Sequence, residues 1–285
     1  LLPISYTFLL LTLVSGKEAN EAARWYEIAG FQFQPSEIAK GAVVITVALI
    51  LSRLQTENGA DKRAFKNIMV VAGSICLLIL PENLSTACLL FGVVVLMMFI
   101  GRVSLIQLGT MFGVLALIGC FGALIAFTMP KENVAQTTGF LHRMQTWSNR
   151  ITTHLSSDQS EEDRNDPMKY DSDKGAQVAH ANIAIVRSNY VGKMPGNSVE
   201  RDFLSQAYSD FIFAIIIEEM GLWGAFIVMA LYLILLFRAS IIAGRCERHF
   251  PAFLVMGLAF LLVSQAFLNM LVAVGLLPGT GPPFP

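Results

Sequence analysis

Residues 84–100 read LSTACLLFGVVVLMMFI, and residues 105–129 read LIQLGTMFGVLALIGCFGALIAFTM. Neither stretch contains a charged side chain, and a short link, residues 101–104, joins them. A helix that crosses a bilayer needs about 20 predominantly apolar residues. Because hydrocarbon offers no hydrogen-bond partners, the backbone must satisfy its own polar groups, as an α-helix does. The two stretches therefore predict a pair of transmembrane helices joined by a tight turn.

The composition of the chain extends this prediction to most of its length. Of its 285 residues, 54% are hydrophobic and 14% are charged, whereas soluble domains carry about 25% charged residues. The net charge of −1 gives no reason to expect nucleic acid as a partner. The expected fold is all-α: a polytopic transmembrane helix bundle that forms a single membrane domain over residues 1–285. Seven stretches qualify, or nearly qualify, as spans: residues 1–15, 38–51, 65–80, 84–100, 105–129, 221–237 and 253–277.

One large polar segment, residues 130–209, separates the fifth stretch from the sixth. Short loops rich in Lys and Arg stay on the cytoplasmic side of a membrane, whereas long loops translocate largely regardless of their charge. Residues 130–209 are therefore predicted to form a large extracytoplasmic loop, because the short loops on the opposite side hold eight cations and those on the same side only Lys17 and Arg24. The eight cations are Arg53, Lys62, Arg63, Lys66, Arg102, Arg238, Arg245 and Arg248.

The main candidate for chemistry is Asp210, which stands at the end of this loop, directly before an apolar run at residues 211–217. Ionisable groups at such a boundary are functional candidates, because a charge in hydrocarbon is costly unless it is satisfied. A partly desolvated carboxylate there suits a general base. It also suits a helix cap, with Ser209 or Asp210 accepting hydrogen bonds from free N–H groups, and the residues alone favour the cap.

Two further groups of polar residues lie at predicted membrane boundaries. Glu218 and Glu219 follow Asp210 by about two helical turns. They suit either a site for a cation or lipid head group, or a polar ledge at the interface. Glu37 and Lys40 are three residues apart on one helix face, which predicts an internal ion pair, with substrate clamping as the alternative.

The remaining signals are weak or absent. Arg24 and Trp25 place a cation beside an aromatic side chain that is typical of a membrane anchor. The chain has no Walker A or Rossmann glycine motif, so an ATP-driven transporter is not indicated. The histidines, at positions 142, 154, 180 and 249, show no metal-ligand spacing and stay unassigned.

Four motifs, in order along the chain, resemble those of the SEDS family, which includes FtsW and RodA. Arg24-Trp25, followed by FQPSE at residues 33–37 and Lys40, is similar to the family's "RW … QPSE..K" signature. PENLSTA at residues 81–87 resembles "QPDLGTA". SDFIFA at residues 209–214 with EEMG at residues 218–221 resembles "TDFIFA…EE.G", and residues 269–285 resemble the run before the last span.

The resemblance implies a fold of ten spans, of which the seven stretches here would be the third to the ninth. The chain would then be a fragment without the first two spans and the last. Residues 192–198 and 201–204 are similar to those of division-type, FtsW-like members. Ser188-Asn189 and Met194 stand where the family usually carries glycines.

The family's activity is peptidoglycan glycosyl transfer, the polymerisation of lipid II into glycan strands at the outer face of the bacterial cytoplasmic membrane during division or elongation. The resemblance implies that Asp210 is the catalytic residue, which moves its expected role from cap to base. It also suggests the substrate-binding residues Arg24, Trp25, Glu37, Lys40, Lys193, Arg201, Glu218 and Glu219.

The expected partners are lipid II, a class B penicillin-binding transpeptidase, and other membrane proteins of the division or elongation complex. A divalent cation, Mg²⁺ or Mn²⁺, is the one cofactor the resemblance allows, and its ligands are unknown. Two rival functions stay open at this stage. One is a lipid II flippase, which would need ionisable groups near the bilayer midplane. The other is a non-enzymatic scaffold for the transpeptidase.

Overall fold

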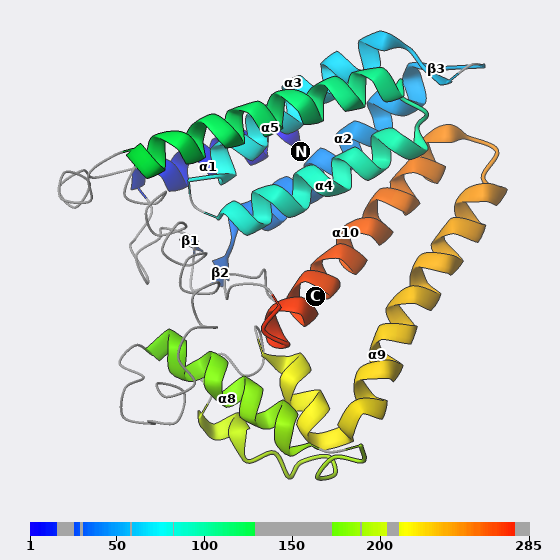
Figure 1. Cartoon of the computed structure of the whole chain (residues 1–285). Helices are drawn as coiled ribbons and strands as arrows, with labels where there is room; N and C mark the ends of the chain where they lie inside the picture. Colours follow the sequence, from blue (N-terminus) through cyan, green and yellow to red (C-terminus); the bar gives the residue numbers. More distant parts are fainter. Residues whose placement is uncertain are drawn as a thin grey trace. The chain divides into compact units, whose positions relative to one another are not determined.

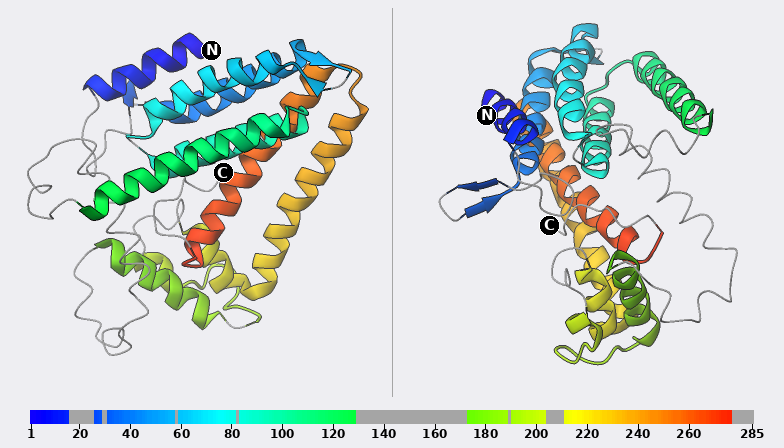
Figure 2. Two further views of the ribbon diagram at one scale, coloured as in Figure 1. Left: turned by 45° about the horizontal axis from the view of Figure 1, so that its top comes forward. Right: turned by 90° about the vertical axis from the view of Figure 1, so that its left-hand side faces the viewer.

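Helices make up most of the regular structure in the computed structural model (Figures 1 and 2). The described residues are 1–15, 26–28, 31–57, 59–81, 83–128, 173–188, 190–203 and 211–276. The predicted all-α class is therefore confirmed. The α-helices are α1 (Leu2–Ser15), α2 (Pro35–Arg53), α3 (Lys62–Ile79), α4 (Leu84–Ile100), α5 (Leu105–Thr128), α8 (Asp173–Arg187), α9 (Ile212–Arg245) and α10 (His249–Ala273).

Each of the seven apolar stretches overlaps a helix. Among the described residues, three helices are long and apolar enough to cross a membrane: α2, α9 and α10. Shorter apolar helical stretches cover residues 2–11, 84–100 and 105–117. Helix α9 extends beyond the expected span, 221–237, at both ends. The exact spans and the single membrane domain stay predictions.

Two short antiparallel ribbons interrupt the helices, and the sequence did not predict them. Strand β1 (Tyr26–Ile28) pairs with β2 (Phe31–Phe33), and β3 (Gln55–Thr56) pairs with β4 (Gly59–Ala60). The second ribbon turns the chain between α2 and α3. Strands of two or three residues are too short to show the alternating pattern by which a strand is recognised.

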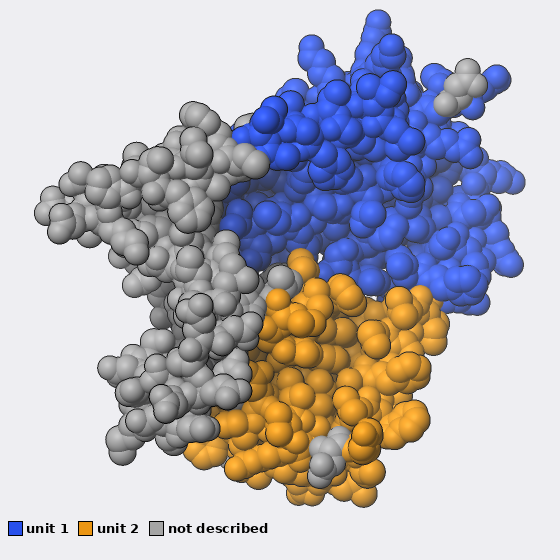
Figure 3. All heavy atoms as spheres, in the orientation of Figure 1, with its two compact units in different colours: residues 1–125, 235–264 blue, residues 126–234, 265–285 orange. Residues whose placement is uncertain are grey.

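The chain divides into two compact units, which we describe separately (Figure 3). Unit 1 comprises residues 1–125 and 235–264, and in it α2 contacts α1, α3 and α4. Local signals set its helix starts: Pro35 opens α2, the Asp61 side chain accepts the N–H of Arg63 at α3, and the Asn83 side chain accepts the N–H of Thr86 at α4. The buried core includes Val43, Val47, Leu51, Ile68, Ile75, Leu90, Val94 and Met97.

Unit 2 comprises residues 126–234 and 265–285. It contains α8, the short 3₁₀ helix η2 (Glu200–Phe203), the first two thirds of α9 and the end of α10. Phe213 and Ile217 of α9 pack against Ala266 and Met270 of α10. On another side of the same helix, Phe211 and Ile215 pack with residues of α8 in a second small cluster. These contacts fix the start of α9 between α8 and α10.

Helix α9 is broken at Gly221, whose backbone angles are φ 69° and ψ −167°. This conformation is essentially restricted to glycine. A helix of 34 residues would be about 51 Å long, well beyond the hydrocarbon thickness of about 30 Å. The arm that follows Gly221 is long enough to cross by itself. The arm that precedes it carries Glu218 and Glu219.

Replacing Gly221 with Ala is expected to destabilise the protein by about 3 kcal/mol or more. The added Cβ would lie 2.3 Å from the carbonyl oxygen of Tyr190, and the backbone angle would be strained in any case. Thermal unfolding of the purified protein measures this loss. Gly244→Ala in the same helix is the matched control, because a Cβ there meets nothing within 4 Å. Its expected effect is neutral or a gain of up to about 1 kcal/mol.

Candidate functional site

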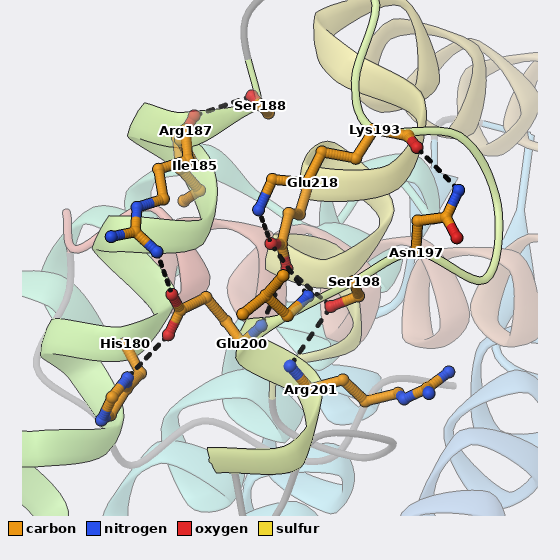
Figure 4. Close-up of polar contacts among 11 residues, drawn as sticks. His180, Ile185, Arg187, Ser188, Lys193, Asn197, Ser198, Glu200, Arg201 and Glu218 are labelled. Atoms are coloured by element: carbon orange, nitrogen blue, oxygen red, sulfur yellow. Dashed lines mark hydrogen bonds and ion pairs between the residues drawn. The ribbon is translucent and has the colours of Figure 1, made fainter.

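A buried carboxylate, Glu218, organises the described part of the loop at residues 130–209 (Figure 4). Its side chain is 0% exposed, and it accepts hydrogen bonds from Lys193 Nζ at 2.6 Å and Ser198 Oγ at 2.6 Å. The backbone N–H groups of Val199 and Glu200 donate to it at 3.2 Å and 3.4 Å. Burying a carboxylate is tolerable only when such partners replace water. Glu218 therefore binds the loop to the first arm of α9.

A second buried carboxylate, Glu200, extends this network to α8. His180 Nδ1 lies 2.7 Å from Glu200 Oε2, and Arg187 Nη1 donates to Glu200 Oε1 at 3.1 Å. The His180 ring also stacks on Phe203, with ring centroids 5.3 Å apart. Because the Glu200 N–H donates to Glu218, the two carboxylates belong to one continuous network. Figure 4 shows how it joins α8, the loop and α9.

The backbone of the loop lies directly against the break in α9. The N–H groups of Lys193 and Met194 donate to the carbonyl oxygens of Glu218 and Glu219 at 3.0 Å and 2.8 Å. A Cβ on Gly192 would lie 2.4 Å from the Glu219 carbonyl oxygen, so only glycine fits there. This close approach fixes the loop's position along α9.

Met194 occupies a left-handed conformation, with φ 76°. This is a position at which the SEDS resemblance led us to expect glycine. A side chain in that region costs about 1–2 kcal/mol, because Cβ crowds the following carbonyl oxygen. A methionine at this position, in place of the family's glycine, therefore strains the backbone of unit 2.

Met194→Gly is expected to raise stability by up to about 1 kcal/mol, since relief of this strain exceeds the entropic cost of a glycine. The apparent melting temperature of the purified protein tests this. Val199→Gly provides the control: Val199 also has an exposed side chain but has no positive φ, so the substitution should be neutral or destabilising. If Met194→Gly is less stable than the wild type, the inference that Met194 strains the backbone is wrong.

The predicted site residues fall into separate groups. Lys193 and Glu218 form an ion pair in unit 2, where the Arg201 N–H also donates to Ser198 Oγ at 3.2 Å. Glu219, which is partly exposed, contributes its backbone carbonyl to the loop. The candidates Arg24, Trp25 and Asp210 lie outside the described residues.

In unit 1, Glu37 and Lys40 form the expected ion pair, with Lys40 Nζ 2.8 Å from Glu37 Oε2. The Lys40 side chain is 1% exposed and that of Glu37 is 41% exposed. Within the described part of the chain, the buried hydroxyl of Ser36 has no hydrogen-bond partner. The start of α2 thus combines a buried ammonium group, a half-exposed carboxylate and an unsatisfied hydroxyl.

Sequence reasoning missed four members of the network: His180, Arg187, Ser198 and Glu200. His180 showed no ligand spacing, Arg187 ends a helix that the sequence analysis did not predict, and Ser198 and Glu200 lie in a polar stretch without hydrophobic periodicity. Their partners are 13 to 20 residues away in sequence. The weak available signal was the position of Ser198 and Glu200 within or next to the two loop segments that resemble the family.

The described residues hold no group of three His, Cys, Asp or Glu side chains that could bind a metal ion. The oxygens of Glu218 already accept four hydrogen bonds, one of them from an ammonium group. Glu218 is therefore a poor ligand for Mg²⁺ or Mn²⁺. A divalent cation stays a prediction without assigned ligands.

Comparison with known proteins identifies the relatives of this chain. It is 31% identical over 292 residues to "Probable peptidoglycan glycosyltransferase FtsW" of Halomonas elongata, an alignment that covers 99% of this chain and 66% of that protein. The protein of the same name from Aliivibrio salmonicida is 29% identical over 286 residues, with 99% and 64% covered. The chain thus spans about two thirds or slightly less of these relatives' length.

Solved structures share the fold. A chain of the structure described as "Structural coordination of polymerization and crosslinking by a peptidoglycan synthase complex" matches with a TM-score of 0.72 and 23% identity, covering 100% of this chain and 72% of that one. The rod shape determining protein RodA of Thermus thermophilus matches with a TM-score of 0.56 and 20% identity, covering 99% and 69%. At these identities, the likeness establishes the fold alone. It agrees with the fold class expected from the apolar stretches.

A family model described as "Cell cycle protein", that of FtsW, RodA and SpoVE, matches residues 1–285, the full length of the chain. The multi-pass membrane character expected from the sequence agrees with this match and with the apolar helices. The chain belongs to the FtsW/RodA/SpoVE family.

Proposed function

We propose that this chain carries the polymerising site of a peptidoglycan glycosyltransferase that joins lipid II units into glycan strands. The relatives' names support this activity. The observation that carries it to specific residues is the Glu218 network. Val199 and Glu200, before Asp210 in sequence, are bonded to Glu218, which follows it. Glu218 therefore joins the chain that precedes Asp210 to the helix that follows it.

The proposed reaction transfers a lipid-linked disaccharide-peptide to a sugar hydroxyl. Asp210 takes the proton from the 4-hydroxyl of the acceptor's GlcNAc as its oxygen attacks the anomeric carbon of the donor. The bond from that carbon to the diphosphate oxygen breaks, and undecaprenyl diphosphate leaves with the electron pair. A carboxylate beside the membrane suits this chemistry, because the sugar is tethered there by its prenyl chain.

Cations are proposed to offset the negative charge that develops on the departing diphosphate. Arg24, Arg201 and Lys40 are the candidates for this role. Lys40 is buried and paired with Glu37, so it would have to exchange that carboxylate for the diphosphate. Lys193 is a weaker candidate for substrate than the sequence indicated, because its ammonium group is bonded to Glu218.

The reaction is proposed to occur at the outer face of the cytoplasmic membrane, with a class B transpeptidase as partner. The eight cations in the opposite loops support this orientation. The structural relative's description as a synthase complex for polymerisation and crosslinking supports such a partner. Under this proposal, the product strand emerges on the side where crosslinking takes place.

The decisive experiment uses the complete protein with its transpeptidase in vesicles that contain fluorescent lipid II. Glycan polymer, resolved by electrophoresis and sensitive to lysozyme, is the expected product. Movement of lipid II between leaflets without polymer would favour the rival flippase. Neither polymer nor movement, from protein that still binds its transpeptidase, would favour the rival scaffold.

A further inference from the structure

Four large apolar side chains project from the end of α8 and the loop that follows it. Val186 is 79% exposed, Tyr190 74%, Val191 70% and Met194 63%. We call these four residues the apolar lip. Isolated exposed apolar residues are ordinary, but four within nine positions of a polar loop are a concentration of the kind that usually marks a contact surface.

The backbone of the lip is fixed at one level along α9. The carbonyl oxygen of Tyr190 lies 2.3 Å from where a Cβ on Gly221 would be. The Met194 N–H donates to the Glu219 carbonyl oxygen at 2.8 Å. The lip therefore lies beside residues 219–221, at the point where the second arm of α9 begins.

That point is also where α9 acquires a lipid-facing surface. Immediately after Gly221, Leu222 is 51% exposed, Trp223 67% and Phe226 60%. Trp residues at the start of a span are enriched at the membrane interface. Trp223 follows Gly221 by only about 3 Å of helix rise, so the lip and Trp223 share nearly one depth.

The two cations beside the lip, Arg187 and Lys193, are paired within the protein. Arg187 is paired with Glu200, and Lys193 is paired with Glu218. The apolar side chains can thus enter a lipid interface without bringing an uncompensated cation. Attraction to anionic lipid is not required either, because the neighbouring cations already have partners.

We propose that the apolar lip inserts into the interfacial region of the bilayer leaflet that α9 enters at Gly221. The loop is then attached in two ways: its apolar lip contacts the lipid, and its polar groups bind Glu218 of α9. This inference depends on unit 2 alone, so it stands or falls separately from the proposed enzymatic reaction.

Spin labels test the insertion in the full-length protein, reconstituted in phosphatidylcholine nanodiscs. A nitroxide is attached at Val191→Cys, in a background with the four native cysteines replaced by alanine. Collisions with oxygen, which concentrates in hydrocarbon, are compared with collisions with a water-soluble nickel chelate. We expect the ratio of oxygen to nickel accessibility to exceed one at Val191 and to fall below one at Asn197→Cys, the exposed control in the same loop.

Tyr190→Trp provides a second measurement that leaves the cysteines untouched. Dibrominated phosphatidylcholine should quench the added tryptophan, seen as a larger quenched amplitude than in the wild type. The result should be the same when phosphatidylglycerol is added, because the cations beside the lip are already paired.

Three outcomes would overturn the proposal. The first is a water-like ratio at Val191 with no added quenching at Tyr190→Trp. The second is shielding from both relaxants, which would mean that protein covers the lip. The third is insertion that occurs only with anionic lipid, which would make the contact electrostatic.

Discussion

Asp210→Asn is expected to lower the rate of glycan polymerisation by about 10²–10⁴-fold, which is the usual contribution of a general base. The amide has nearly the same size as the carboxylate but cannot accept the proton of the attacking hydroxyl. Initial rates with fluorescent lipid II, at saturating substrate, measure the effect. The substitution should leave the KM for lipid II nearly unchanged, since the proton is transferred only in the transition state.

Glu247→Gln is the matched control for this substitution. It makes the same chemical change at an exposed residue between α9 and α10, in a loop that we predict to be cytoplasmic. It should polymerise lipid II like the wild type. If Asp210→Asn polymerises equally well, the assignment of Asp210 as the base is wrong. If the variant is inactive only because it no longer binds its transpeptidase, co-purification will reveal the loss.

Removal of the Glu218 carboxylate is expected to have the largest effect on stability. Glu218→Leu leaves Ser198, the N–H groups of Val199 and Glu200, and the Lys193 ammonium group without their acceptor. Loss of one partner of a buried ion pair typically costs about 3–5 kcal/mol. The apparent melting temperature should fall, and trypsin should cleave the loop near Lys193 more readily than in the wild type.

A double-mutant cycle separates the ion pair from the rest of the network. Lys193→Met alone leaves a buried charge without its countercharge, and is also expected to destabilise. In the double variant, neither charge remains, so its loss should be smaller than the sum of the single losses by about 1–3 kcal/mol. Strictly additive losses would show that the 2.6 Å contact contributes no coupling energy.

The same variants test whether the network serves catalysis. If Glu218 acts by positioning the segment that contains Asp210, Glu218→Leu should lower kcat at temperatures where the protein remains folded. A variant with normal kcat and a lowered melting temperature would restrict Glu218 to a structural role.

Sequence alone located the apolar helices and the membrane boundary at which to look for chemistry. Uncharged stretches such as residues 84–100 predict helices in hydrocarbon, because only internally bonded backbone is stable there. Local signals were equally readable: Pro35 opens α2, and Glu37 and Lys40 pair at three-residue spacing. The order of short motifs indicated the family. These inferences depend on neighbours in sequence or on the solvent, and neither requires knowledge of the tertiary structure.

Only the tertiary structure identified the partners of Glu218. Sequence left a cation site and an interfacial ledge equally open, and the structure places the carboxylate at 0% exposure against Lys193, 25 residues away. It also explained why glycine is needed at position 221, where Tyr190 approaches from a distant part of the chain. Apolar burial repeats with the period of a helix and can be read locally. A buried polar group is stable only beside specific distant partners, and no local pattern records which ones they are.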